Sequence, residues 1–187
     1  KTSFIHSAFE NCAATISGVE TAFRSLKKHG ELPVQREKMN FIAFGGDGGT
    51  YDIGLQSLSG AMERGHNMLY VCYDNEAYMN TGTQRSGLTP AGARTTTTML
   101  GKRENPKDMC RIMEAHGIPY VASTSAVYPD DVYDKLLRAR ALKGLRYVHM
   151  NTPCPSGWSF EPRDSVSVGQ LAVDTGLVVL FEIENGL

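Results

Sequence analysis

The sequence predicts an α/β fold, with a mainly parallel sheet flanked by helices. Short apolar runs, typical of buried parallel strands, alternate with segments whose apolar residues recur at helical spacing. A glycine-rich turn at Gly45 to Thr50 directly follows the first of these runs. Strand–helix alternation favours parallel pairing, because each crossover helix returns the chain to the same edge of the sheet.

The expected elements follow one another along the chain, and Gly or Pro residues often separate them. The first helix, for example, should end near Lys28, before Gly30 and Pro33. In chain order we expect a helix over 9–28, a polar surface loop at 31–38, a buried strand at 41–44, a turn at 45–50, a helix over 55–62, a buried strand at 68–73, a long loop at 76–105, a helix at 109–113, a strand at 120–122, a helix at 132–139, a strand at 147–150, a late helix around 168–172 and a final strand at 178–181.

The long loop is polar and rich in Thr and Gly. Loops of this length in a compact domain are usually functional or disordered. Within it, the run at 95–98 is either a polar surface strand or a segment that orders the loop over an active site. We favour the second interpretation, because this run closes the loop.

Composition excludes several classes of function. A chain of 187 residues is by default one domain with a sizeable core. Its net charge of −1, without basic clusters, indicates no nucleic-acid face and no membrane patch. No apolar run could span a bilayer, and no secretory signal is visible, which favours a cytoplasmic protein. Because the chain starts at Lys1, we expect a single domain over 1–187 that forms part of a longer subunit.

The cysteines Cys12, Cys72, Cys110 and Cys154 lie far apart, with no CxxC pair. This spacing in a cytosolic chain argues against a disulfide framework. It also matches no common four-cysteine metal site. The simplest interpretation makes Cys12, Cys72 and Cys110 buried small hydrophobes.

The glycine-rich turn is the first chemical signal. It follows a predicted strand and precedes a predicted helix. Glycines there let backbone N–H groups approach an anion closely, and a helix N-terminus favours phosphate. Asp47 within the turn is suited to a hard cation, since a carboxylate and phosphate oxygens are ligands that Mg²⁺ accepts.

A second polar segment, at 73–78, follows the next predicted strand and contains Asn75. One right-handed crossover joins the two segments. If the strands are neighbours, their ends lie roughly 5 Å apart. Asp47 and Asn75 could then reach one metal at the carboxyl edge of the sheet, where ligands of open α/β sheets bind. The sequence therefore predicts a Mg²⁺–diphosphate site.

Each signal also has a simpler explanation. Glycine-rich turns after strands are common, Asp47 could cap the following helix, and Asn75 could close a turn. A nicotinamide-binding fold is a further alternative, although the run lacks GxGxxG spacing. In that case Asp74 or Glu76 could be taken for a ribose contact.

The motif Gly46-Asp47-Gly48, with Asn75 28 positions after Asp47, resembles the GDG…N signature of thiamine-diphosphate enzymes. The longer segment GGDGGTYDIGLQSLSGAMERGHNMLYVCYDNEAYMNTGTQRSGLTP is similar to the β subunit of 2-oxoacid:ferredoxin oxidoreductases, of which pyruvate:ferredoxin oxidoreductase is the best known. HSAFENCAA, CPSGW and LFEIENG also resemble that subunit, so the resemblance covers nearly all of the chain.

The resemblance implies a thiamine-diphosphate-binding domain of the type that holds the diphosphate half of the cofactor. Asp47, the Asn75 side chain and the Ala77 carbonyl would ligate Mg²⁺, with diphosphate oxygens and water completing the shell. Gly46 and Gly48, with Gly49 beside them, would give the diphosphate its close backbone approach.

The resemblance also implies catalytic positions at Asn80 and Thr81, near the thiazolium ring and the bound substrate. Asn80 could donate a hydrogen bond to the substrate oxyanion. Cys154 would be one ligand of a 4Fe–4S cluster. The family's other cluster cysteines come from a segment upstream of the first helix, which this chain does not contain. We therefore expect the cluster only if another segment or another chain supplies the missing ligands.

The implied activity is oxidative decarboxylation of a 2-oxoacid, with pyruvate as the first expectation. Coenzyme A would take the acyl group, and electrons would pass through iron–sulfur clusters and a ferredoxin-like subunit to ferredoxin. No candidate is visible for the carboxylate that acts on the pyrimidine ring. A sister subunit with the pyrimidine-binding domain is therefore expected, and this chain alone should be inactive.

Two alternatives stay open. A non-oxidative thiamine-diphosphate decarboxylase or synthase would not need Cys154. A non-catalytic nucleotide-binding module of flavodoxin-like type would use the glycine-rich turn without needing Asn75.

Other polar residues receive simpler interpretations. His6 and Glu10 should lie on the first helix, as contacts near its start. His66 should be solvated beside a turn. Trp158 should pack under the loop that carries Cys154.

Overall fold

The structure is a computed structural model that describes residues 3–8, 10–33 and 39–187. Expectations for Phe9 and for most of the 31–38 loop fall on residues outside this description. The elements in chain order are α1 (Cys12–Lys28), β1 (Ile42–Gly46), the π-helix η2 (Gly49–Ile53), α2 (Leu55–Glu63), β2 (Leu69–Asp74), β3 (Ala77–Tyr78), β4 (Gln84–Arg85), α3 (Met109–Glu114), β5 (Tyr120–Ser125), α4 (Pro129–Ala141), β6 (Arg146–Asn151), α5 (Pro155–Trp158), the 3₁₀ helix η3 (Pro162–Asp164), α6 (Ser165–Asp174) and β7 (Phe181–Glu184).

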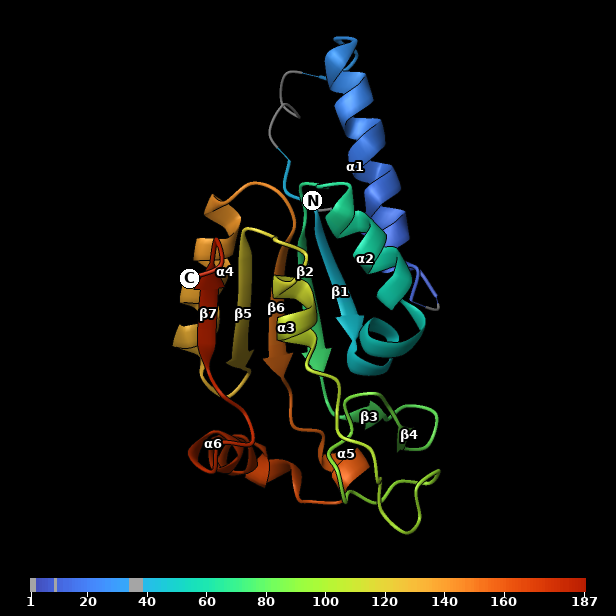
Figure 1. Ribbon diagram of the computed structural model, residues 1–187, viewed down its shortest axis with the longest axis vertical. Coiled ribbons are helices and arrows are strands. Elements are labelled where there is room, and N and C mark those ends of the chain that lie inside the picture. The colour runs from blue at the N-terminus through green and yellow to red at the C-terminus, as the bar shows by residue number, and fades with distance from the viewer. Residues whose placement is uncertain (1–2, 9, 34–38) are drawn as a thin grey trace.

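A five-stranded sheet in the order β1-β2-β6-β5-β7 organises the molecule (Figure 1). The first four of these strands pair in parallel, and β7 pairs antiparallel with β5. The expected α/β fold with a mainly parallel sheet is confirmed. The final strand is shifted from the expected 178–181 to Phe181–Glu184, because the residues just before it form the connection from α6.

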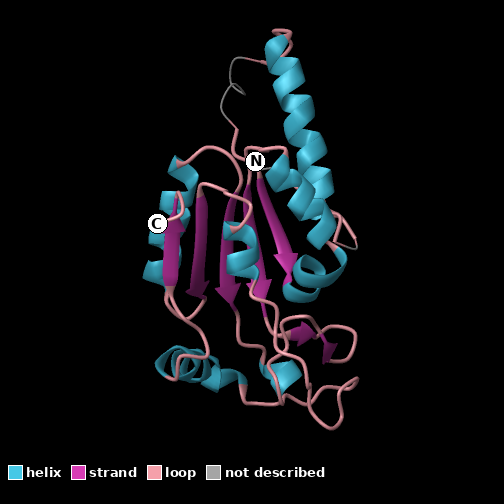
Figure 2. Cartoon of the chain, viewed as in Figure 1, coloured by secondary structure: helices cyan, strands magenta, loops and turns pink. Residues whose placement is uncertain are grey.

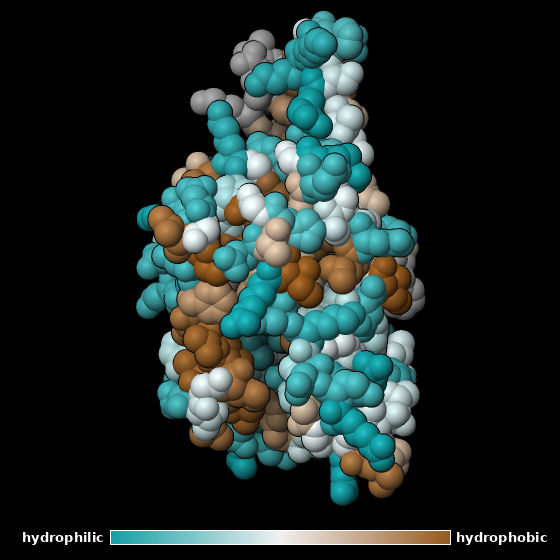
Figure 3. Space-filling view, viewed as in Figure 1, coloured by the Kyte–Doolittle hydropathy of each residue, from teal (hydrophilic) through white to brown (hydrophobic). Residues whose placement is uncertain are grey.

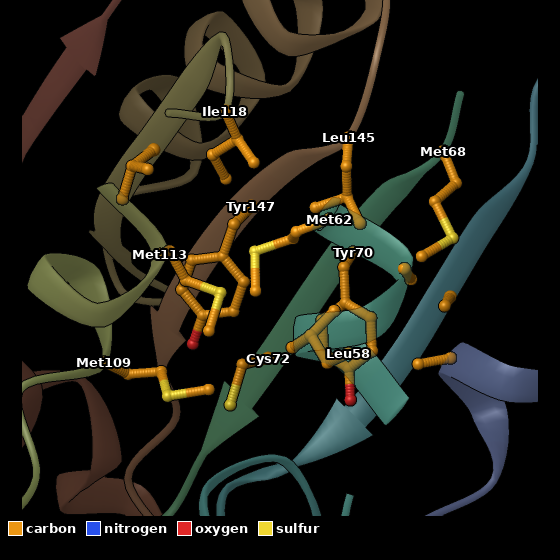
Figure 4. Close-up of a cluster of buried hydrophobic side chains, with 14 of the residues drawn as sticks. Leu58, Met62, Met68, Tyr70, Cys72, Met109, Met113, Ile118, Leu145 and Tyr147 are labelled. Atoms are coloured by element: carbon orange, nitrogen blue, oxygen red, sulfur yellow. The ribbon is translucent and has the colours of Figure 1, made fainter. Parts of the chain in front are cut away.

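Helices cover both faces of the sheet. On one face, α1, α2 and α3 pack a large apolar core against β1, β2 and β6. Figure 4 shows Tyr70 of β2 beside Tyr147 of β6, and their rings stack with centroids 6.1 Å apart. Leu58 of α2 and Met113 of α3 close over them. On the other face, α4 packs a smaller core against β2, β5 and β6.

The apolar run at 41–44 predicted a strand buried on both sides, but only one side of β1 is buried. Ala43 faces the core and is 5% exposed, whereas Phe44 is 61% exposed. β1 is an edge strand, and α4 lies over β5 and β6 rather than over it. Ile42 and Phe44 line an open apolar groove with Tyr133 and Leu137 of α4. The prediction was wrong because an apolar run does not show which faces a neighbouring layer will cover.

All four parallel strands end at one edge of the sheet, and a second layer of structure lies beyond that edge (Figure 2). It contains β3, β4, α5 and α6, with the long loop at 76–105. Apart from the short β3–β4 pair, no regular strand or helix forms between Ala77 and α3. The expected long loop at 76–105 is therefore observed, interrupted only by the short β3–β4 pair.

Apolar side chains gather on the face that carries α6 and the connection to β7 (Figure 3). Leu171, Leu177 and Val179 there are each about 60% exposed. Within the described residues, no helix is both long and apolar enough to cross a membrane.

The predicted helices and internal strands agree with the structure to within a few residues, but two local expectations were wrong. α1 begins at Cys12, so His6 and Glu10 precede it instead of lying on it. His66 is buried rather than solvated, because its Nδ1 lies 2.8 Å from Oε2 of the buried Glu20 on α1. A long-range partner of this kind leaves no local trace in the sequence.

Leu58 should be a strong test of the main core. Its side chain is fully buried between α2 and the sheet. We expect Leu58→Ala to lower the free energy of unfolding by about 2–5 kcal/mol, through lost burial and a residual cavity. Leu171→Ala, at an exposed position on α6, should change it by no more than about 0.5 kcal/mol. Urea unfolding followed by circular dichroism measures both, and equal effects would contradict this assignment of the core.

Candidate functional site

The carboxyl ends of β1 and β2 bring the two polar segments together. The strands are direct neighbours in parallel register, with Gly46 opposite Tyr73. Asp47 follows the last residue of β1, and Asn75 follows the last residue of β2. The adjacency on which the sequence argument depended is therefore observed.

Three oxygen-bearing groups converge there. The Asn75 side-chain NH₂ group donates to the Ala77 carbonyl oxygen at 2.8 Å and to Asp47 Oδ1 at 3.1 Å. Rotating the amide by 180° would place its carbonyl oxygen there instead, so that three oxygens would face a bound cation.

This donor set fits Mg²⁺. A carboxylate, a side-chain amide oxygen and a backbone carbonyl are hard oxygen ligands, and Mg²⁺ usually keeps further positions for phosphate and water. Among the described residues, no three His, Cys, Asp or Glu side chains gather into a metal site of their own. A cation at this edge would therefore depend on Asn75 and Ala77 as much as on Asp47.

Asp47 is held in an almost solvent-free position. Only 2% of it is exposed, and its Oδ2 accepts a hydrogen bond from Ser86 Oγ at 2.5 Å. Burial, together with the nearby Asp74 carboxylate, raises the pKa of Asp47 to about 7. Burial, together with the Asp74 and Asp47 carboxylates, also raises the pKa of Glu76 to about 7. Concentrated negative charge with little water to solvate it is an environment that favours a bound cation.

The expected turn at 45–50 does not form, because strand β1 continues directly into a helical segment. Gly45 and Gly46 complete β1, and the chain enters helical conformation at Asp47, continuing into η2. A Cβ on Gly48 would lie 2.3 Å from the Tyr78 ring, and one on Gly49 would lie 1.6 Å from the Glu10 carboxyl group. The Tyr78 ring therefore leaves no room for a side chain at Gly48, whereas at Gly49 the carboxyl end of Glu10 would have to move. At Gly46 the nearest atom would be 3.5 Å away, so this position has ordinary space.

Asp52 of η2 connects the site to the long loop. Its carboxylate accepts hydrogen bonds from Lys107 Nζ at 2.8 Å, from the Gly87 N–H at 2.9 Å and from the Tyr78 hydroxyl at 3.0 Å. Burial acts to raise the pKa of Asp52, but these hydrogen bonds, with that from Lys107 foremost, outweigh it, so the pKa lies below its usual value. The loop is thus tied to the segment that follows Asp47.

The expected catalytic pair lies on the open side of this edge. Asn80 and Thr81 are exposed in the turn between β3 and β4. Thr81 Oγ1 donates to Gln84 Oε1 at 2.6 Å, which closes the turn. Thr96 braces the same turn, because its Oγ1 donates to the Gly82 carbonyl at 2.8 Å. The 95–98 run therefore orders the part of the loop that carries these two residues.

Cys154 lies apart from the other cysteines of the chain. It is half-buried at the start of α5, where its Sγ is 3.5 Å from Ser156 Oγ. Cys72 and Cys110 are buried in the main core, and Cys12 packs against it, in agreement with their interpretation as small hydrophobes. Burial raises the pKa of all three thiols. In the part of the chain that the structure describes, no group of three or more potential metal ligands forms around Cys154.

Several residues that hold the site were not anticipated. Trp158 of α5 donates from Nε1 to the Asn75 carbonyl at 3.0 Å, and Thr89 Oγ1 donates to the Glu76 carbonyl at 2.5 Å. Trp158 thus packs against the loop that carries Asn75 and Ala77. Thr89 and Ser86 come from the long loop, and its unusual length was the one sequence signal that pointed to them.

Comparison with known proteins decides the family. Residues 2–150 match the model of the thiamine pyrophosphate enzyme, C-terminal TPP binding domain. The chain belongs to this family. The convergence of Asp47, Asn75 and Ala77 is therefore found in a TPP-binding domain, at the sheet edge where the sequence predicted it.

This TPP-binding domain is similar to subunits of 2-oxoacid oxidoreductases. It is 55% identical over 188 aligned positions to pyruvate synthase subunit PorB of Methanothermobacter marburgensis, covering 98% of this chain and 62% of that protein. It is 49% identical to PorB of Thermotoga maritima, over 98% of this chain and 58% of that protein. It is 46% identical to ketoisovalerate oxidoreductase subunit VorB of Pyrococcus abyssi, over 97% of this chain and 59% of that protein. The chain thus spans about three fifths of the length of these relatives.

A solved structure shares the fold. The 2-oxoglutarate:ferredoxin oxidoreductase of Magnetococcus marinus, determined with 2-oxoglutarate, coenzyme A and succinyl-CoA bound, superimposes with a TM-score of 0.69 at 28% identity. The match covers 84% of this chain and 49% of that one. The TPP-binding domain therefore has the architecture of an oxidoreductase subunit.

Asp52 should make stability depend on pH in a defined window. Its folded-state pKa lies below the unfolded value of about 3.9, so its contribution is fully present above about pH 4 and is lost as pH falls through the folded pKa. We expect Asp52→Asn to destabilise the protein at pH 7 and the difference to shrink below about pH 4. Urea unfolding across pH 3–7 measures this, with the exposed Asp174→Asn on α6 as control. A difference that stays constant down to pH 3 would contradict the assignment.

Proposed function

We propose that this chain holds the Mg²⁺–diphosphate end of thiamine diphosphate in a 2-oxoacid:ferredoxin oxidoreductase. The observation that carries the proposal is the convergence of Asp47 Oδ1, the Asn75 amide and the Ala77 carbonyl at the ends of two adjacent parallel strands. The named relatives, which are pyruvate synthase and ketoisovalerate oxidoreductase subunits, support the oxidoreductase class.

In this proposal the chain's own residues bind and orient the cofactor. Asp47, Asn75 and Ala77 provide three oxygen ligands, which leaves the remaining positions of an octahedral Mg²⁺ for diphosphate and water. Backbone N–H groups of the helical segment from Gly48 supply a positive dipole end toward the diphosphate, and Gly46 has space for its close approach.

Bound thiamine diphosphate would supply the nucleophilic carbon and the electron sink for decarboxylation of the 2-oxoacid. Asn80 and Thr81 lie in the exposed turn between β3 and β4, where an amide N–H could stabilise developing oxyanion charge on a substrate. Pyruvate is the proposed substrate, because most of the named relatives are pyruvate synthase subunits. Coenzyme A is the proposed acyl acceptor and ferredoxin the proposed electron acceptor.

Other chains complete this active site in the proposal. A sister subunit contributes the pyrimidine-binding domain, and a ferredoxin-like subunit carries electrons onward. Cys154 provides one thiolate of a 4Fe–4S cluster, whose other ligands come from outside the described residues. Its half-buried position at the start of α5 is close in sequence to Trp158, which contacts Asn75. The chain acts in the cytoplasm, where thiols remain reduced.

The metal site is tested by Asp47→Asn and Asn75→Ala in the full-length chain within its assembled complex. Both remove a proposed Mg²⁺ ligand, so we expect the apparent Kd for Mg²⁺ in the presence of thiamine diphosphate to rise more than about 100-fold, beyond the usual effect of residues outside the ligand shell. Isothermal titration calorimetry measures this directly.

Asp130→Asn is the matched control, because it removes an exposed carboxylate in the first turn of α4, outside the proposed ligand set. It should leave the Mg²⁺ affinity unchanged. Binding of thiamine diphosphate that is independent of Mg²⁺, or insensitive to Asp47→Asn, would refute the proposed site.

The cluster assignment is tested by Cys154→Ser. In the assembled complex we expect this variant to lose about four iron atoms and about four sulfides per copy of the chain, while the thiamine diphosphate content stays the same. Iron and acid-labile sulfide analysis measures the loss, and Cys110→Ser, within the core, is the control. Unchanged iron in Cys154→Ser would instead favour a non-oxidative thiamine-diphosphate enzyme.

A further inference from the structure

A buried polar chain joins the two halves of the proposed metal site. Tyr51 lies in η2, just after Asp47, and Asp74 ends β2, just before Asn75. His149 of β6 stands between them, with its Nδ1 2.9 Å from the Tyr51 hydroxyl and its Nε2 3.0 Å from Asp74 Oδ2. All three residues are buried: Tyr51 is 1% exposed, His149 is 9% exposed and Asp74 is 4% exposed.

The direction of these hydrogen bonds follows from the chemistry of the groups. A carboxylate accepts, so the bond to Asp74 is made with the Nε2–H of His149 as donor, and Nδ1 accepts from the Tyr51 hydroxyl. The Tyr147 hydroxyl lies 3.5 Å from the same Nδ1. Both nitrogens of the buried ring therefore have hydrogen-bond partners, as a buried position requires.

The second oxygen of Asp74 continues the path into the ligand loop. Asp74 Oδ1 accepts from the backbone N–H of Glu76 at 2.7 Å. Glu76 has φ of +70°, a left-handed backbone conformation that non-glycine residues adopt only when their surroundings impose it. This bond therefore fixes the turn that carries Asn75 and Ala77. Both carboxylate oxygens of Asp74 therefore hold hydrogen bonds within the chain.

We propose that His149 is a positioning residue, which cross-links η2 to the end of β2 and so sets the distance between Asp47 and Asn75 before Mg²⁺ binds. The inference rests on the proposed function, because it takes those two side chains as Mg²⁺ ligands. His149 touches neither the metal nor the substrate in this role. Groups that orient metal ligands in this way typically change metal affinity 10- to 100-fold when they are removed.

The Tyr51–His149 bond can be removed with a closely matched control. Tyr51→Phe deletes the hydroxyl that reaches His149. Tyr120→Phe deletes the hydroxyl of an equally buried residue, which donates to Glu182 Oε2 at 2.6 Å in a part-buried contact between β5 and β7. Tyr120 lies at the amino end of its strand, away from the ligand edge. The two variants therefore compare the same chemical change inside and outside the proposed cross-link.

Mg²⁺ titration in the presence of thiamine diphosphate, on the full-length chain in its assembled complex, is the first measurement. We expect Tyr51→Phe to raise the apparent Kd for Mg²⁺ about 10-fold, and Tyr120→Phe to change it less than about twofold. His149→Leu should raise it further. His149→Gln, which keeps a donor and an acceptor, should recover part of the affinity and serves as the test should Tyr51→Phe fail to fold.

Amide hydrogen exchange of the 74–77 segment, without Mg²⁺ or thiamine diphosphate, is the second measurement. We expect faster exchange in Tyr51→Phe and in His149→Leu, and no change in Tyr120→Phe, because only the first two disrupt the path to the Glu76 N–H. Variants that lower the melting temperature but leave both the exchange and the Mg²⁺ affinity unchanged would overturn the inference. If the unsubstituted protein bound no Mg²⁺–thiamine diphosphate, the proposed function would fail, while the exchange data would still decide the cross-link.

Discussion

The structure depends on one hydrogen-bonded junction, in which the Asn75 amide joins the Asp47 carboxylate to the Ala77 carbonyl at the ends of β1 and β2. Both oxygens lie within hydrogen-bond distance of the Asn75 NH₂ group, and Asp47 and Ala77 are each 2% exposed. A cation at this junction would take the place of that group, with the amide turned to present its oxygen. Parallel strand pairing makes it possible, because it ends adjacent strands at the same edge.

The layer beyond the sheet edge keeps these groups in place. Ser86 and Thr89 from the long loop, together with Trp158 from α5, contribute hydrogen bonds to Asp47 or to the backbone of the ligand turn. Asp52 ties the same loop to η2. The loop therefore acts as the supporting shell of the site, which explains why so long an irregular segment is well packed.

The core explains why the edge is rigid. α1, α2 and α3 bury the stacked rings of Tyr70 and Tyr147, and the Tyr70 hydroxyl also lies 3.0 Å from Thr50 Oγ1 beside the glycine-rich segment. A Cβ at Gly45 would lie 2.2 Å from that hydroxyl. Core packing and the site thus share residues, so a change in one is transmitted to the other. The open face of β1 and the apolar surface over α6 lie outside this rigid unit.

The sequence by itself determined the alternation of strands and helices, the strand ends that carry Asp47 and Asn75, and the resemblance that pointed to thiamine diphosphate. Those features depend on local periodicity and on residue order, which the chain encodes directly. Only the tertiary structure decided that Phe44 is exposed, that His66 pairs with Glu20 and that His149 bridges η2 and β2. These outcomes depend on which distant elements pack together, and pairings across dozens of residues leave no periodic signal in the sequence.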